Sequence, residues 1–216
     1  MMRPVWWGMA LVLAGGVAGP VAAQDVVGGD LPPPGYGTLK QDNVSIRVTS
    51  SDLDIRFLPL DERLLRLLAP DAYQSLHGLV ASRQAAIDSA ARDAGVSSPG
   101  LALVTFFALA PNAQFDPQNL SLLYHNQYYR PTAIVPYTAN FGGRQLQVRQ
   151  QATGIYLFEN PVPVFDGFTL VYGPSQSNAW DNVLRTIGTE RSRVLSRWQA
   201  DRGDSAGRGD SAGRKP

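Results

Sequence analysis

Apolar and polar residues alternate along the chain from Val44 to Phe57, and this alternation predicts two β-strands. Val44, Ile46 and Val48 are separated by polar residues, and the same pattern resumes at Leu53 after a turn sequence. Side chains point to opposite faces of a strand in turn, so this pattern buries one face and leaves the other in water. The segment therefore predicts two half-buried strands and allows a hairpin between them.

Two helices are predicted next. Residues 61–68 (DERLLRLL) have acids in the first turn, which favours a short helix. A longer helix is expected from Pro70, whose missing N–H costs nothing at a first helical position, to Ala94, which precedes Gly95. Its apolar residues recur at helical spacing and form one line, namely Tyr73, Leu76, Val80, Ile87, Ala91 and Ala94.

Beyond residue 100 the pattern becomes that of a sheet. Residues 101–109 (LALVTFFAL) are almost all apolar, which predicts a central strand buried on both faces. Turn residues separate the later strand candidates, which are residues 120–126, 128–135 broken by Pro131, 145–150, 154–158 and 168–172. Short strands at this spacing predict an antiparallel β-sandwich or barrel, mostly β, with a helical insertion at residues 60–94.

A last helix is predicted at residues 177–199. Its apolar stripe consists of Trp180, Leu184, Ile187, Val194 and Trp198. The stripe is short and Gly188 interrupts it, which favours packing on the protein's own sheet over a coiled coil with a partner. Residues 200–216 contain no large apolar residue, so we expect them to form a disordered tail.

The segment from Gly154 to Gly173 resembles the closing hairpin of immunoglobulin-like domains in bacterial secreted proteins. The resemblance rests on GIYLFE at residues 154–159, a turn that contains Pro and Val, and FTLVYG at residues 168–173. It implies an immunoglobulin-like version of the sandwich without a disulfide, because the chain has no cysteine. It implies no functional residue.

The start of the chain has the pattern of a secretory signal peptide. A positive start at Arg3 precedes an apolar run at residues 5–19, and Val21 and Ala23 are the small residues that a signal peptidase reads. We therefore expect cleavage after Ala23 and a periplasmic or secreted protein. An uncleaved membrane anchor is the alternative, which Pro20 and the glycines disfavour. The expected organisation is a signal peptide at 1–23, an extended Pro- and Gly-rich lead-in at 24–42 and one β-rich domain at 43–199.

Composition excludes several classes of chemistry. Without cysteine there is no thiolate metal site, no redox pair and no cysteine nucleophile. The chain has 19 basic and 18 acidic residues, and removal of Arg3 with the leader brings the formal charge near zero. Such a balance gives no general attraction to nucleic acid or anionic lipid. We therefore expect no nucleic-acid partner, and membrane contact only through an uncleaved leader.

No catalytic residue, cofactor or metal site is predicted. His77 and His125 have no second ligand at a metal-binding spacing, and the chain lacks the GxSxG and GxxxxGK motifs. The candidate acids for a glycosidase-like pair lie in turns or on polar faces, namely Asp52, Asp54, Asp116, Glu159 and Asp166. Sequence alone selects no pair among them. A hydrolase that acts on glycan through carboxylates brought together by the fold is the alternative function.

The densest aromatic stretch predicts a recognition surface. Tyr128 and Tyr129 are adjacent, so a strand would turn them to opposite faces, and Arg130 beside them can pair with carboxylates. Ordinary cross-strand packing is the competing interpretation. Our main hypothesis is a non-enzymatic, extracytoplasmic domain that binds an envelope protein or glycan through Tyr128, Tyr129 and Arg130.

The tail repeats an Arg-Gly-Asp-Ser unit. The copies are Arg202, Gly203, Asp204 and Arg208, Gly209, Asp210, each followed by serine. The unit resembles the integrin-binding motif of animal matrix proteins, which implies adhesion through the tail as a minor alternative. A tandem duplication in GC-rich DNA would produce the same repeat.

Overall fold

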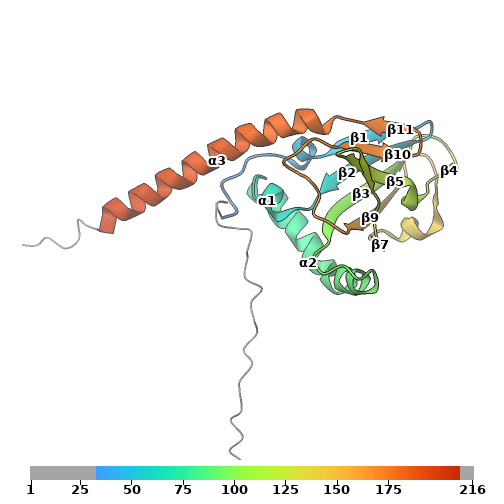
Figure 1. The fold of residues 1–216 in the computed structure, drawn as a ribbon, viewed down its shortest axis with the longest axis horizontal. Coiled ribbons are helices and arrows are strands. Elements are labelled where there is room, and N and C mark those ends of the chain that lie inside the picture. The colour runs from blue at the N-terminus through green and yellow to red at the C-terminus, as the bar shows by residue number, and fades with distance from the viewer. Residues whose placement is uncertain (1–32, 210–216) are drawn as a thin grey trace, which may run out of the picture.

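The computed structural model describes residues 33–209, which form two antiparallel β-sheets packed against each other (Figure 1). One sheet has five strands in the order β1-β2-β3-β9-β7, and the other has four in the order β11-β10-β5-β6. The sandwich predicted from the sequence is confirmed. The predicted signal peptide and residues 210–216 of the predicted tail lie outside the described residues.

The elements have the following bounds. The five-stranded sheet contains β1 (Ile46–Thr49), β2 (Leu53–Pro59), β3 (Gly100–Ala108), β9 (Gln151–Phe158) and β7 (Ala133–Pro136). The four-stranded sheet contains β11 (Ser175–Ser177), β10 (Thr169–Tyr172), β5 (Leu120–Tyr124) and β6 (Gln127–Tyr129). A two-stranded ribbon pairs β4 (Ala113–Gln114) with β8 (Gln145–Leu146). The α-helices are α1 (Glu62–Leu65), α2 (Pro70–Asp93) and α3 (Trp180–Gly209), and the 3-10 helices are η1 (Gln41–Val44), η2 (Pro117–Asn119) and η3 (Ala139–Gly143).

The first two predicted strands form the expected hairpin. Strands β1 and β2 are antiparallel, with Thr49 opposite Asp54 across the turn. Their apolar positions are buried, as the alternation predicts. Val44, which we placed in the first strand, is buried at the end of η1 instead. The lead-in is therefore partly helical before the first strand begins.

Strand β3 is the central strand of its sheet, but only one of its faces is fully buried. Ala102, Val104 and Phe106 are fully enclosed, whereas Leu101 and Leu103 on the other face are half-buried. The prediction that both faces are buried is therefore wrong. Helix α2 packs on the outer face of this sheet, mainly along the edge strand β7.

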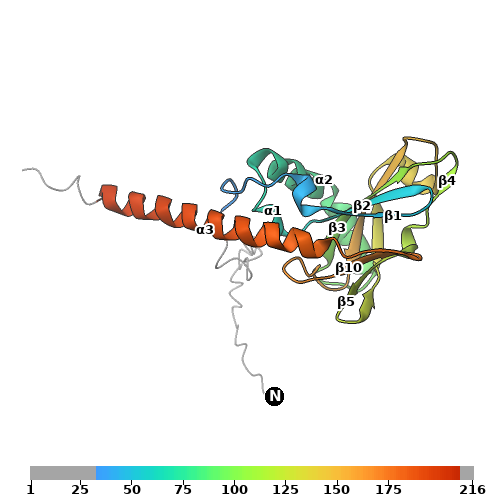
Figure 2. The same ribbon diagram turned by 90° about the horizontal axis from the view of Figure 1, so that it is seen from above.

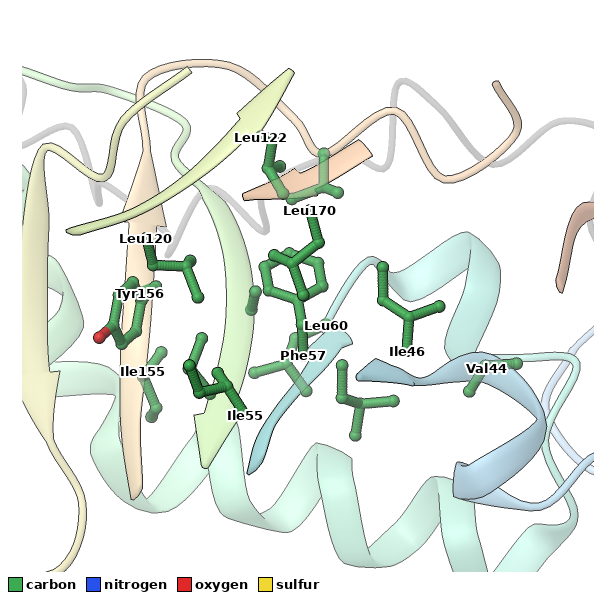
Figure 3. Close-up of a cluster of buried hydrophobic side chains, with 14 of the residues drawn as sticks. Val44, Ile46, Ile55, Phe57, Leu60, Leu120, Leu122, Ile155, Tyr156 and Leu170 are labelled. Atoms are coloured by element: carbon green, nitrogen blue, oxygen red, sulfur yellow. The ribbon is translucent and has the colours of Figure 1, made fainter. Parts of the chain in front are cut away.

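The core lies between the two sheets (Figure 3). Ile55, Phe57 and Tyr156 from the five-stranded sheet approach Leu120 and Leu170 from the other sheet. Each of these side chains is fully or almost fully buried. Burial of this apolar area is the main force that holds the layers together.

The segments that resemble an immunoglobulin-like closing hairpin do not pair with each other. Strand β9 pairs with β3 and β7, while β10 pairs with β5 and β11. The two strands thus belong to different sheets, and the expected hairpin is wrong. The Pro-containing connection between them crosses from one sheet to the other.

The predicted strand at residues 128–135 is two strands in different sheets. Tyr129 ends β6 in the four-stranded sheet, and Ala133 starts β7 in the five-stranded sheet. Pro131 lies between them and has no N–H to give to a sheet ladder. Strands β6 and β7 are the edges of their two sheets, whereas β1 lies against β11 and β10 on the opposite side.

Both predicted helices of the insertion are confirmed. Asp61 caps α1 by accepting a hydrogen bond from the N–H of Arg63 at 2.9 Å. Helix α2 begins at Pro70, and the chain turns at Gly95, whose φ is 71°. The predicted apolar line of α2 is buried at Leu76, Ile87 and Ala91, half-buried at Tyr73 and Val80, and exposed at Ala94.

Helix α3 is fixed to the domain through its first half. Trp180, Ile187 and Val194 of the predicted stripe are fully buried, and Trp180 stacks on Phe168 with ring centroids 4.8 Å apart. The carboxylate of the buried Glu190 accepts hydrogen bonds from the N–H and hydroxyl of Thr38, at 2.7 and 3.0 Å. The lead-in is thereby joined to α3.

Helix α3 continues past the predicted end at Gln199 to Gly209, and this part projects from the sandwich (Figures 1 and 2). The helix is therefore longer than the predicted one. A formed helix extends without a new nucleation cost. The Arg202 guanidinium also lies 4.7 Å from the Trp198 ring centroid, and Asp201 forms a hydrogen bond with Tyr36 that raises the pKa of this phenol. Among the described helices, none has the length and apolar character to cross a membrane.

Candidate functional site

The predicted recognition segment lies in the β5–β6 hairpin at the open side of the sandwich. His125 and Asn126 form its two-residue turn, with φ of 48° and 64°. Two successive residues with positive φ are typical of the type I′ turn, which suits the twist of a hairpin. Asn and His are both among the non-glycine residues that are enriched at positive φ. The turn places Tyr129 opposite Leu122.

The structure separates the two predicted tyrosines. Tyr129 is half-buried and faces inward with its cross-strand partner Leu122, whereas Tyr128 points to the other face and is 64% exposed. Arg130 is exposed next to them. The three predicted residues therefore do not form one contiguous contact. Tyr129 lines a cavity.

This cavity, which we call the aromatic cavity, has a volume of about 90 Å³. Its lining is mostly apolar and comes from β5, β6, the end of β9 and the loop that follows, namely Leu122, Tyr124, Tyr129, Phe158, Asn160, Pro161, Val162 and Pro163. Leu122, Phe158 and Val162 are almost fully buried. The tyrosines and prolines are thus its more accessible walls.

Neighbouring groups hold the rings of the aromatic cavity in place. The Tyr124 hydroxyl donates to Asp166 Oδ2 at 3.2 Å, and desolvation together with this hydrogen bond raises the pKa of Tyr124. The His125 ring stacks on Tyr124 at a centroid distance of 3.9 Å, and the centroid of the Tyr129 ring lies 6.0 Å from that of Tyr124. Such fixed rings lose little conformational freedom on binding.

Sequence reasoning missed Tyr124 and the prolines of this cavity. Tyr124 lies two residues after Leu122. Because alternate residues of a strand share a face, the sequence could have placed both on one face of β5. Pro161 and Pro163 come from a distant segment, and no local pattern connects them with the tyrosines.

The candidate carboxylates are distributed over the molecule. Asp54 pairs with Arg47, Asp116 caps η2, and Asp166 holds Tyr124. Asp52 and Asp116 come from different loops, yet the charge of each raises the pKa of Tyr172, after the larger effect of burial. The fold therefore brings these two carboxylates into the electrostatic neighbourhood of one phenol.

The histidines are parts of aromatic stacks. His77 stacks on Tyr73 with ring centroids 5.4 Å apart, and its Nδ1 lies 3.9 Å from Glu62 Oε2. His125 stacks on Tyr124 as described above. Within residues 33–209, no three His, Asp or Glu side chains gather as ligands for a metal ion.

The residues of the predicted adhesion motif lie at the end of α3 or beyond it. Arg202 lies over Trp198, residues 203–209 belong to the projecting part of the helix, and Asp210 lies outside the described residues. Adhesion through the motif stays a prediction.

Comparison of the chain with models of known protein families, with curated proteins and with solved structures gave no match. The interpretation of the site therefore rests on its geometry.

Proposed function

We propose that the chain is an exported, extracytoplasmic binding domain whose aromatic cavity receives an apolar group of an envelope protein or glycan. The observation that carries this proposal is an apolar cavity at an open edge, with two tyrosine rings fixed beside it. Apolar pockets with a few oriented polar groups are typical binding sites. Export rests on the leader sequence.

The size and lining of the cavity favour a protein side chain. A cavity of roughly 150 Å³ lined by apolar residues is known to hold benzene, so one of about 90 Å³ suits a smaller aliphatic or proline-like group. A sugar ring carries hydroxyl groups that this lining would leave without partners. An envelope protein is therefore the preferred ligand of this site.

Contact through side chains is favoured over addition of a β-strand. The edge strand β6 has only three residues, Gln127–Tyr129, and Pro131 follows shortly after it. Short edges with nearby proline are a common protection against strand pairing. We place Tyr124 and Tyr129 at the contact, with Arg130 as a neighbouring partner for carboxylates.

Two measurements test the proposal. Xenon binds in accessible apolar cavities, so NMR under xenon pressure should shift the resonances of Tyr129 and Phe158 first. Affinity for a partner isolated from envelope extract should fall by over about 1 kcal/mol in Tyr129→Ala, as is common for buried anchors. Tyr128→Ala, which changes the opposite face of β6, and Tyr137→Ala are controls of the same chemistry. Equal affinity of a folded Tyr129→Ala variant would contradict the proposal.

A glycan hydrolase is the second candidate, and it requires two carboxylates that face each other across a cleft. Paired carboxylates are the usual catalytic groups of glycosidases. Incubation with cell-wall glycans should then give products with the wild type and none with Asp52→Asn or Asp116→Asn. No turnover at high protein concentration would eliminate this candidate.

A further inference from the structure

A second cavity lies at the opposite end of strand β5 from the aromatic cavity. Leu120 starts β5 and is paired with Tyr172, whereas Tyr124 ends β5 at the aromatic cavity. We call the second cavity the polar cleft. It has a volume of about 500 Å³ and is lined by Gln114, Phe115, Asp116, Asn119, Gly143, Arg144, Gln145 and Tyr172. This volume is in the range of known ligand sites, which is roughly 300–1,000 Å³.

A buried hydroxyl group in the lining of the polar cleft has an unused donor. Tyr172 is 8% exposed, and its hydroxyl oxygen accepts a hydrogen bond from the N–H of Asp116 at 3.0 Å. A phenol can also donate one hydrogen bond. Within the described part of the chain, the Tyr172 proton has no acceptor. Buried polar groups normally have partners, so an unused donor on a residue that lines a cavity indicates a ligand or water there.

Arg144, which also lines the polar cleft, adopts a backbone conformation that favours glycine. Its φ is 52°, directly after Gly142 and Gly143, which do not have positive φ. A residue with a Cβ in this region is disfavoured by about 1–2 kcal/mol. Its guanidinium forms no ion pair or hydrogen bond with any described residue. Arg144 thus combines a strained backbone with a guanidinium group whose N–H donors are available at the cleft.

Asp116 and Asn119 complete the wall with acceptors. Asp116 Oδ1 accepts from the N–H of Gln118 at 3.0 Å, which leaves Oδ2 available among the described residues. The exposed Asn119 amide provides one acceptor and two donors. The cleft is therefore lined by a cationic donor, an anionic acceptor and neutral groups that can donate or accept hydrogen bonds.

We propose that the polar cleft binds a neutral saccharide, with adjacent hydroxyl groups held by Asp116, Asn119, Arg144 and Tyr172. A sugar hydroxyl both donates and accepts, so it matches the carboxylate, the guanidinium and the phenol together. Asp116 would repel an anionic ligand, and Arg144 would repel a cationic one. An apolar ligand would leave the remaining donors and acceptors of these four residues without partners. This site is independent of the aromatic cavity and its proposed ligand.

The experiment is an NMR titration of the mature chain with cellotriose, maltotriose and chitotriose. At least one trisaccharide should give saturable shifts at Asn119, Arg144 and Tyr172. Arg144→Gly should lower the affinity about tenfold or more, because a hydrogen bond to a charged group is lost. Asp116→Asn should weaken binding while preserving the helix cap, since Asn caps as well as Asp.

Arg149→Gly is the matched control. Arg149 also has positive φ, 67°, and lies in the nearby turn outside the lining of the cleft. Both glycine variants relieve backbone strain, so both should fold, and only Arg144→Gly should lose affinity. Tyr129→Ala should bind the sugar as the wild type does, which separates this site from the aromatic cavity. Absence of saturable shifts with all three sugars, or equal losses in both glycine variants, would overturn the proposal.

Discussion

Strand β5 begins beside the polar cleft and ends at the aromatic cavity. The side chains at these two sites differ in whether their polar groups have partners within the protein. At the aromatic cavity, Tyr124 is held by Asp166 and by a stacked His125 ring. At the polar cleft, Tyr172 and Arg144 keep donors without partners among the described residues. The same sandwich thus carries two different surfaces. At the aromatic cavity the side chains already have partners within the protein, whereas at the polar cleft hydrogen-bond donors remain available to a ligand.

The largest expected effect concerns the core that supports both ends. Trp180 is fully buried against Phe168, and its indole nitrogen has no hydrogen-bond partner in the described part of the chain. Trp180→Ala should therefore lower the free energy of unfolding by about 3–5 kcal/mol. Trp180→Phe should cost much less, because it preserves the stacking and loses no hydrogen bond. Chemical denaturation measures both variants.

If the two variants were equally unstable, the indole N–H would contribute to stability after all. If neither were destabilised, the helix α3 would not belong to the common core.

A smaller effect on the free energy of unfolding is expected in alkali from Tyr172 at the polar cleft and Tyr124 at the aromatic cavity. Burial raises the pKa of Tyr172, and it also raises the pKa of Tyr124. The folded state therefore retains these phenol protons longer than the unfolded state does. Their contribution is fully present below the unfolded pKa of about 10, and the free energy of unfolding falls as pH rises above it. Denaturation at pH 9, 10 and 11 measures this slope.

The decrease of the free energy of unfolding with pH should be smaller in Tyr172→Phe than in the wild type. An identical slope in Tyr172→Phe would show that this phenol does not titrate differently on folding.

The smallest effect is expected from the projecting end of α3. A chain that ends at Gln199 loses the contact of Asp201 with Tyr36 and the cation–π contact of Arg202 with Trp198. Contacts of this exposed kind add little stability. The melting temperature should therefore fall slightly, and binding at both cavities should be unchanged. A chain that ends at Val194 also loses Trp198 and should melt at a lower temperature.

A large drop for the chain ending at Gln199 would show that the repeats contribute to the folded domain. Circular dichroism would report the shortened helix in the same samples.

Local patterns predicted the parts of the fold that depend on neighbours in sequence. The alternation around Ile46 and Ile55 gave the first hairpin, and Pro70 and Gly95 gave the ends of α2. Pairing between distant segments was not predictable in this way. No local signal tells that Phe158 and Leu170 lie in strands of different sheets, or that only one face of β3 is fully buried.

The candidate sites were predicted only in part for the same reason. Tyr129 stands out in an aromatic stretch, but the cavity beside it also needs Pro161 and Pro163 from a loop between the sheets. Arg144 gave no signal, because the neighbouring glycines are the residues expected at a positive φ. The polar cleft depends on Asp116, Arg144 and Tyr172, which the chain brings together only by folding.

The hydrogen bonds from Thr38 to Glu190 have a mechanical consequence. They join the lead-in before β1 to helix α3. The hydrogen bond between Tyr36 and Asp201 adds a second link further along that helix. A pulling force applied between the two ends of the chain would act first on these links and only afterwards on the β-sheets. The domain could thus be held under tension at its ends while both cavities keep their shape.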